Sequence, residues 1–184
     1  KASPTEIMNA ILRADVELLW FGGIGTYVRA SHESAAEVGD RTNDAIRVTA
    51  KQVGASVVGE GANQGITQPA REEFCQHGGR CNSDAIDNSG GVNSSDVEVN
   101  IKIALQPALA DQTLSRGKRD WLLENMTDSV AELVLKTNYD QTLAISRAER
   151  AGATQLQLQN RLMQSLEARG LLDRKIEDLP DADA

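Results

Sequence analysis

The sequence predicts an α/β protein: a parallel sheet with helices on its faces, followed by a helical C-terminal segment. Two observations lead to this prediction. Short apolar runs alternate with helix-like segments over residues 1–110, and residues 111–184 hold no strand-like run but carry apolar residues at helical spacing. We therefore expect a sheet domain over residues 1–110 and a C-terminal helical segment over residues 111–184.

Capping and apolar patterns predict the first two elements. Ser3-Pro4-Thr5-Glu6 combines a capping hydroxyl with a proline in the first turn, which predicts a helix ending near Arg13. The continuous apolar run Val16 to Phe21 predicts a strand buried on both faces of a parallel sheet. Gly23-Ile24-Gly25 follows it; because a dinucleotide fingerprint would need a third glycine, we expect a flexible turn, with a phosphate contact as the alternative.

Turn residues, helix caps and short apolar runs predict the elements between residues 40 and 110. Thr67 and Pro69 predict a helix start, Gly78-Gly79 predicts its end, and Pro107 is expected to close a later helix. The predicted elements in chain order are a short helix or a helix and a loop over Asp40–Val53, a strand over Ser56–Gly59, a helix over Thr67–Gln76, a weak strand over Cys81–Ile86, and a helix from Ser94 or Ser95. This alternation favours βαβ units and a partial Rossmann-like sheet.

Beyond Asp111 the apolar residues follow helical spacing, which predicts helices that pack on one another and on the sheet. Gly170 is expected to end the last long helix, and residues 173–184 are expected to form a solvated acidic tail.

Composition narrows the class of protein. The chain has 184 residues and a net charge of −8, so it lacks the basic face that nucleic-acid binding requires. No apolar run reaches membrane-spanning length and no signal peptide is visible, so we expect a cytoplasmic protein that does not enter membranes. Since the chain opens on Lys1 and directly on a helix, we expect it to be a piece of a larger protein.

Cys75, His77 and Cys81 lie close in sequence and raise the question of a zinc site. A structural zinc site takes four ligands at regular spacing, and this cluster offers three at best. We therefore expect reduced thiols and no metal.

Two glycine- and amide-rich segments mark the candidate site: Glu60-Gly61-Ala62-Asn63 after one predicted strand and Asn88-Ser89-Gly90-Gly91-Val92 after the next. The carboxyl ends of parallel strands meet at one edge of a sheet, where ligands bind in open α/β folds. Glycines allow a ligand to approach the backbone, and asparagines offer paired donors and acceptors. We therefore expect these two tips to lie side by side and to line one crevice.

Together with Ser95 and Glu98, these two segments resemble the glutamate dehydrogenase family in order and spacing. Three further stretches resemble more specifically the very large bacterial NAD-specific glutamate dehydrogenases: Leu18 to Tyr27, Gly39 to Asp44, and Met126-Thr127-Asp128. The resemblance implies that residues 1–110 are the later half of the NAD-binding domain of a larger oxidoreductase of amino-acid metabolism. It implies NAD as the cofactor, glutamate and 2-oxoglutarate as substrates, the remainder of the parent chain as a partner, and a homo-oligomeric parent.

The resemblance also implies roles for individual residues. Asn63, with Gly61 and Ala62 before it, matches the asparagine that faces the nicotinamide ribose. Asn88 matches the asparagine near the nicotinamide amide, while Gly90 and Gly91 allow close approach. Ser95 matches the serine that meets the side-chain carboxylate of the substrate.

Structural interpretations stand beside these roles. Asn63 and Asn88 are alternatively turn formers, and Ser95 is alternatively only a helix cap. Glu60 and Glu98 we interpret as structural. Asp96, Val99 and Ile101 differ from the family pattern, so the wall of the substrate pocket differs.

No catalytic residue is expected in this chain, because the family's catalytic lysines, aspartate and phosphate loop lie upstream. The sequence thus predicts one wall of the cleft of an NAD-dependent glutamate dehydrogenase, inactive by itself. A related amino-acid dehydrogenase with another substrate and a non-catalytic α/β binding or assembly module remain alternatives.

Overall fold

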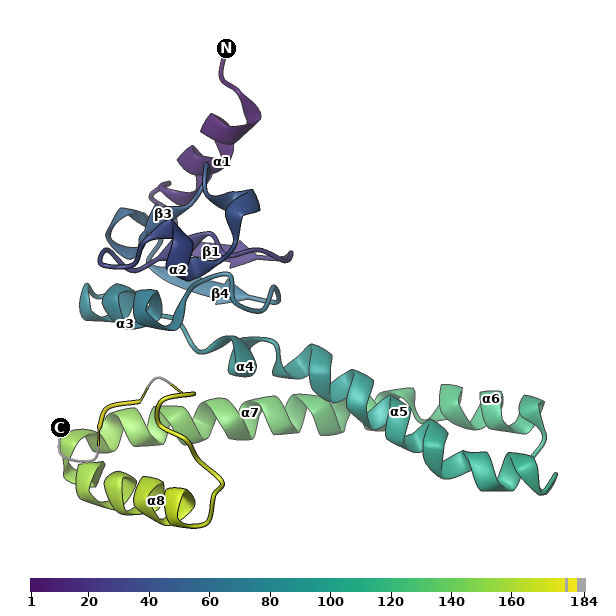
Figure 1. The fold of residues 1–184 in the computed structure, drawn as a ribbon. Coiled ribbons are helices and arrows are strands. Elements are labelled where there is room, and N and C mark those ends of the chain that lie inside the picture. Colours follow the sequence, from purple (N-terminus) through teal and green to yellow (C-terminus); the bar gives the residue numbers. More distant parts are fainter. Residues whose placement is uncertain (178, 182–184) are drawn as a thin grey trace. The chain divides into compact units, whose positions relative to one another are not determined.

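The computed structural model describes residues 1–177 and 179–181, and it divides into two units, Lys1–Asn138 and Tyr139–Ala184. Figure 1 shows the order of the elements along the chain. The helices are α1 (Pro4–Leu12), α2 (Ala35–Val38), α3 (Gln68–Gln76), α4 (Asp84–Asp87), α5 (Ser89–Ala110), α6 (Arg116–Asn125), α7 (Thr127–Ala151) and α8 (Leu156–Ala168), with 3-10 turns η1 (Arg41–Asn43), η2 (Ala50–Gln52) and η3 (Gly152–Gln155). The strands are β1 (Leu18–Phe21), β2 (Val28–Arg29), β3 (Val48–Thr49) and β4 (Val57–Glu60).

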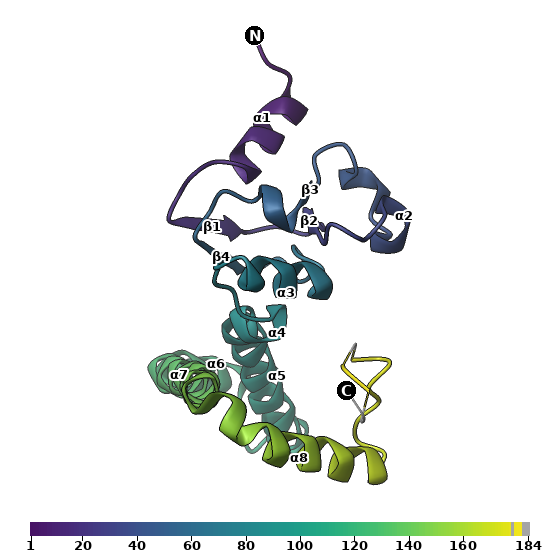
Figure 2. The same ribbon diagram turned by 90° about the vertical axis from the view of Figure 1, so that its left-hand side faces the viewer.

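The strands of the first unit pair in parallel, as predicted. Strand β1 pairs with β4 from Leu18↔Val57 to Phe21↔Glu60, and β2 pairs with β3 in a second two-stranded sheet. Helix α3 lies beside β4 in both views (Figures 1 and 2). The helix-rich α/β class is therefore confirmed.

Two predicted helices form where their caps indicated. Ser3 and Glu6 make a reciprocal capping box at the start of α1. The Thr67 side chain accepts a hydrogen bond from the Ala70 backbone N–H at the start of α3. After Gln76, Gly78 adopts the left-handed conformation at φ +91° and ends α3.

Strand β1 differs from the prediction because only one of its faces is covered. Phe21 is buried with Val58, Ile66 and Phe74 in the core of the first unit. Leu18 and Trp20, which alternate with it along the strand, are 55% and 57% exposed. Within the described residues, β1 is thus a half-buried strand.

The predicted strand over Cys81–Ile86 is wrong. Just before this segment, Arg80 forms an isolated bridge with Val57 of β4, and the chain then turns into the short helix α4. Asn82, Ser83 and Asp84 favour turns and helix starts over strands. The local preference therefore prevails, and the chain leaves the sheet.

Helix α5 is longer at both ends than predicted. It begins at Ser89 instead of Ser94 or Ser95, and Pro107 lies inside its last turn. Pro107 has no backbone N–H to donate, so the helix loses one hydrogen bond there, yet it continues to Ala110. The expected loop tip at Asn88 to Gly91 is therefore the N-terminal turn of a long helix.

The C-terminal residues are helical, as predicted, but their apolar residues are only partly covered. In the first unit Val134 is buried, whereas Trp121 is 64% exposed. In the second unit Gly170, at φ +66°, follows α8. In the acidic tail, residues 173, 175–177 and 179–181 are exposed, as expected, whereas Arg174 is buried and donates to Glu167 Oε1 over 2.7 Å. Residues 178 and 182–184 lie outside the described residues.

No helix among the described residues is long and apolar enough to cross a membrane.

Candidate functional site

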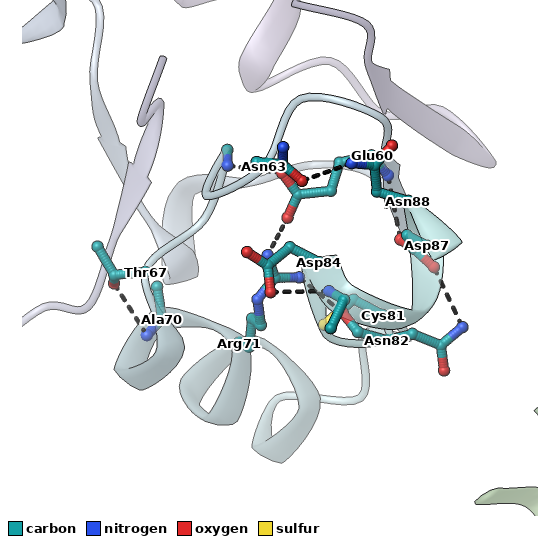
Figure 3. A network of polar contacts seen from close by, with 12 residues as sticks. Glu60, Asn63, Thr67, Ala70, Arg71, Cys81, Asn82, Asp84, Asp87 and Asn88 are labelled. Atoms are coloured by element: carbon teal, nitrogen blue, oxygen red, sulfur yellow. Dashed lines mark hydrogen bonds and ion pairs between the residues drawn. The ribbon is translucent and has the colours of Figure 1, made fainter. Parts of the chain in front are cut away.

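The two asparagines predicted to face the cofactor lie side by side. Asn63 follows β4 in a turn, with its backbone in the left-handed region at φ +56°, and Asn88 directly precedes α5. The Asn88 Nδ2 atom donates a hydrogen bond to Asn63 Oδ1 over 2.7 Å (Figure 3). The predicted proximity of the two tips is confirmed, although one tip is a tight turn and the other a helix start.

Glu60 fixes the turn that carries Asn63. Its side chain is fully buried, and Glu60 Oε2 accepts a hydrogen bond from the Gly65 backbone N–H over 2.6 Å, which closes the turn. Glu60 Oε1 forms a buried ion pair with Arg71 Nη2 of α3. The structural interpretation of Glu60 is thus confirmed.

Arg71 and Asp87 connect that turn to the segment that carries Asn88 (Figure 3). Arg71 Nη1 donates to the Asn82 backbone oxygen over 2.6 Å. Asp87 Oδ2 accepts the Glu60 backbone N–H over 3.0 Å, and Asp87 Oδ1 accepts from Asn82 Nδ2 over 3.2 Å. Burial raises the pKa of the Asp87 carboxyl above its ordinary value.

Sequence reasoning missed Arg71, Asn82 and Asp87. Asp87 directly precedes Asn88, which is a local signal, but nothing in the sequence pairs Arg71 with Glu60 eleven residues away. We define the polar junction as Glu60, Arg71, Asn82 and Asp87 with the two asparagines that they hold, Asn63 and Asn88. It consists of groups from β4, α3 and α4 and the chain beside them, linked by hydrogen bonds between segments separated in sequence.

The remaining cofactor candidates differ in their surroundings. Gly61 is exposed near the Trp20 indole, whereas Ala62 is buried in the core and offers a ligand no side chain. A Cβ at Gly91 would lie 3.2 Å from Asn88 Oδ1, so the missing side chain leaves that oxygen free space. A Cβ at Gly90 would instead meet the side chain of Asn138 at 3.5 Å.

Ser95 lies within α5 and is exposed, so it is not a helix cap and the expectation of a helix start there is wrong. It nevertheless shares a hollow of about 420 Å³ with Asn88 and Gly91; the other lining residues are Val92, Asp96 and Val99. Residues 88, 91, 92, 95, 96 and 99 recur at helical spacing, which places them on one face of α5. Of the predicted site residues, Asn88, Gly91 and Ser95 therefore border one surface depression, whereas Asn63 does not line it.

The amide pair retains hydrogen-bonding capacity. Within residues 1–177 and 179–181, no further hydrogen bond of the Asn63 Nδ2 donor or the Asn88 Oδ1 acceptor is found. A primary carboxamide carries one acceptor oxygen and one donor NH₂ group, so it complements this free donor and acceptor. The residues therefore fit an amide-bearing planar group.

A metal centre finds no support in the described part of the chain, where no three His, Cys, Asp or Glu side chains gather around a common point. His77 Nδ1 lies 2.7 Å from the Glu73 backbone oxygen at the end of α3. Cys75 and Cys81 are free thiols.

Comparison with known proteins gives consistent matches. The family model "Bacterial NAD-glutamate dehydrogenase, catalytic domain" matches residues 1–148. An NAD-specific glutamate dehydrogenase of Pseudomonas aeruginosa is 52% identical over 180 residues, and those of Halomonas elongata and Mycobacterium tuberculosis are 48% and 47% identical over 180 and 178 residues. These alignments cover 97–98% of this chain but only 11% of each relative.

Proposed function

The chain belongs to the family of bacterial NAD-glutamate dehydrogenase catalytic domains, as its motifs predicted, and from this premise we propose that it forms one wall of a cofactor and substrate cleft. The parent protein would oxidise L-glutamate with NAD to 2-oxoglutarate and ammonia. The observation that carries the proposal is the hydrogen bond between Asn88 and Asn63, beside a hollow that Ser95 also lines.

NAD supplies the hydride acceptor, the C4 atom of its nicotinamide ring. The residues of this chain bind and orient the groups beside that atom. Asn63 and Asn88 would offer their free donor and acceptor to the ribose and carboxamide side of the nucleotide, and Gly61 and Gly91 would leave room for it. Because the hydrogen bond between the two amides already orients both side chains, NAD binding would cost little side-chain conformational entropy.

Ser95 would donate its hydroxyl proton toward the side-chain carboxylate of the substrate. It lies seven residues after Asn88 on the same face of α5, about 10 Å further along the helix axis. This separation leaves space for the substrate between the nicotinamide and the serine. A branched or aromatic substrate would be expected to meet an apolar side chain at position 95. Because Ser95 is polar, an acidic substrate is favoured.

Strands β1 and β4 would belong to a Rossmann-like sheet that the rest of a longer parent protein completes, with a homo-oligomer as the working form. The family's catalytic residues match no position here, so residues 1–184 alone are expected to show no glutamate-dependent NADH formation. Steady turnover by the purified chain would contradict this.

The test uses the full-length protein that contains this chain. Asn88→Ala should raise the dissociation constant for NAD about tenfold, because a hydrogen-bonded amide contributes roughly 0.5–1.5 kcal/mol and its removal also releases Asn63. Asn125→Ala is the matched control, since that exposed amide donates to the Trp121 backbone oxygen outside the hollow. Titration calorimetry with NAD and initial rates with glutamate report binding and turnover separately.

Unchanged NAD affinity and turnover in Asn88→Ala would favour the rival class, a non-catalytic α/β binding or assembly module. NAD binding with a preference for a substrate other than glutamate would favour a related amino-acid dehydrogenase.

A further inference from the structure

We propose that Cys75 and Cys81 form a reversible thiol-modification site, which reacts with a small disulfide and closes into an intramolecular disulfide bond. The two Sγ atoms lie 3.6 Å apart, in contact, although both residues are free thiols. Bond formation requires them to approach to about 2 Å. The inference is independent of cofactor binding.

The turn after α3 brings the two thiols together. The Gly79 backbone N–H donates to the Phe74 oxygen over 3.0 Å, and the Gly78 N–H donates to the Cys75 oxygen over 3.0 Å. A Cβ at Gly79 would lie 2.4 Å from the Phe74 ring, so only glycine allows the chain to fold back so closely. The return path that places Cys81 beside Cys75 is therefore built into the backbone.

Cys81 is held on both sides. Before it, Arg80 makes two backbone hydrogen bonds at the start of β4: it donates to the Ser56 oxygen over 3.1 Å and accepts from the Val58 N–H over 2.9 Å. After it, the Asn82 oxygen accepts from Arg71. Because Cys81 also packs against the core, its thiol stays near Cys75 instead of swinging into solvent.

The two thiols differ in reactivity. Cys75 is exposed and can meet a reagent in solution. Burial, together with the neighbouring Cys75 thiol, raises the pKa of the Cys81 thiol to about 12. Because the thiolate is the nucleophile, Cys75 reacts first and Cys81 second.

The chemistry is a pair of thiol–disulfide exchanges. The Cys75 thiolate attacks one sulfur of the small disulfide, so that a mixed disulfide forms and one thiolate leaves. That step also removes the charge of Cys75 from beside Cys81. Cys81 then loses its proton and attacks Cys75 Sγ, which releases the second small thiolate; two protein thiols are oxidised and one small disulfide is reduced to two thiols.

Arg80 lies between the cysteines and makes the test direct, because trypsin separates Cys75 in residues 72–80 from Cys81 in residues 81–102. The native full-length protein is incubated with oxidised glutathione, free thiols are blocked with N-ethylmaleimide, and the unreduced digest is analysed by mass spectrometry. We expect the two peptides to appear linked, with the linked form exceeding glutathione adducts about tenfold, since the contacting thiols have a high effective concentration. Dithiothreitol should release both peptides.

Glutathione adducts without linked peptides, or no modification of either peptide, would overturn the proposal. The single variants test the order of attack. Cys81→Ser should accumulate the adduct on Cys75, and Cys75→Ser should leave Cys81 modified at least about tenfold more slowly. Equal rates in the two variants would refute the assigned order.

Discussion

The polar junction and the exposed surface of helix α5 beyond Asn88 differ in how their polar side chains are held. In the junction, Glu60 bonds Arg71, and Asn88 bonds Asn63, across 11 and 25 residues of sequence. On α5, Asn100 donates to Asp96 and Lys102 to Glu98, both within one helical turn. The contacts of the junction, of which the Glu60–Arg71 pair is buried, hold segments that are distant in sequence together, whereas the exposed contacts on α5 link only neighbouring turns of one helix.

The largest expected difference in stability is between removing Arg71 from the polar junction and removing Lys102 from α5. Arg71→Met leaves the buried Glu60 carboxylate without its partner and should lower the free energy of unfolding by about 3–5 kcal/mol. Lys102→Met removes the same kind of partner from the exposed Glu98 and should have no measurable effect. Urea titrations followed by circular dichroism compare the two variants.

Equal losses of stability in these two variants would show that the two regions do not differ in this respect. A Glu60→Gln/Arg71→Met double variant should recover part of the lost stability, because it no longer buries a lone charge.

The second-largest difference is expected from replacing a glycine by alanine in each region. A Cβ at Gly65 would lie 2.8 Å from the buried Glu60 Oε2 and 3.2 Å from the Phe21 ring, so Gly65→Ala should cost about 1–3 kcal/mol of stability. Gly91→Ala should not destabilise the fold, because alanine favours a helix by up to about 1 kcal/mol over glycine. It should instead weaken NAD binding about threefold to tenfold, since the new methyl group displaces the Asn88 oxygen.

Thermal unfolding and NAD titration of both variants check this pair. Gly117→Ala, at a helix position with open space around it, is the control for helix propensity alone. If Gly91→Ala lowered stability as much as Gly65→Ala, the N-terminal turn of α5 would belong to the rigid region.

A smaller effect is expected at Asp96, which borders the hollow beside Ser95. If the substrate carboxylate binds at Ser95, the exposed charge of Asp96 repels it. Asp96→Asn should lower KM for glutamate about twofold to fivefold in the full-length protein, with kcat nearly unchanged, since screened surface charges contribute less than about 1 kcal/mol. An increase in KM would instead assign Asp96 to a cationic group of the substrate.

The smallest effect is on the pH dependence of stability, where the two regions should respond with opposite signs. Burial raises the pKa of Asp87 above 3.8, so its contribution is present below that pH and is lost as pH rises through the folded pKa. The hydrogen bond and charge of Lys102 lower the pKa of Glu98 below 4.5, so its contribution is present above that pH and is lost as pH falls through the folded pKa.

Melting curves of Asp87→Asn and Glu98→Gln between about pH 3 and pH 7 measure these slopes against the unsubstituted chain. With rising pH, the unsubstituted chain should lose stability relative to Asp87→Asn and gain it relative to Glu98→Gln. Slopes of the same sign would show that Asp87 is not desolvated.

Local rules in the sequence determined the elements whose signals lie within a few residues. Ser3 and Thr67 cap helices, Gly78 and Gly170 follow helix ends in left-handed conformations, and the helices α6, α7 and α8 follow Asp111. The motifs around Asn63, Asn88 and Ser95 also identified the family, because the order and spacing of these residues can be read from the sequence without knowledge of the fold.

Only the tertiary structure decided what depends on a distant partner. Residues 81–86 leave the sheet after one bridge at Arg80, because a strand exists only where a neighbouring edge offers hydrogen bonds. Trp20 is exposed since nothing described covers that face of β1. The Glu60–Arg71 pair and the position of Asp87 arise from packing between segments, which no local pattern encodes.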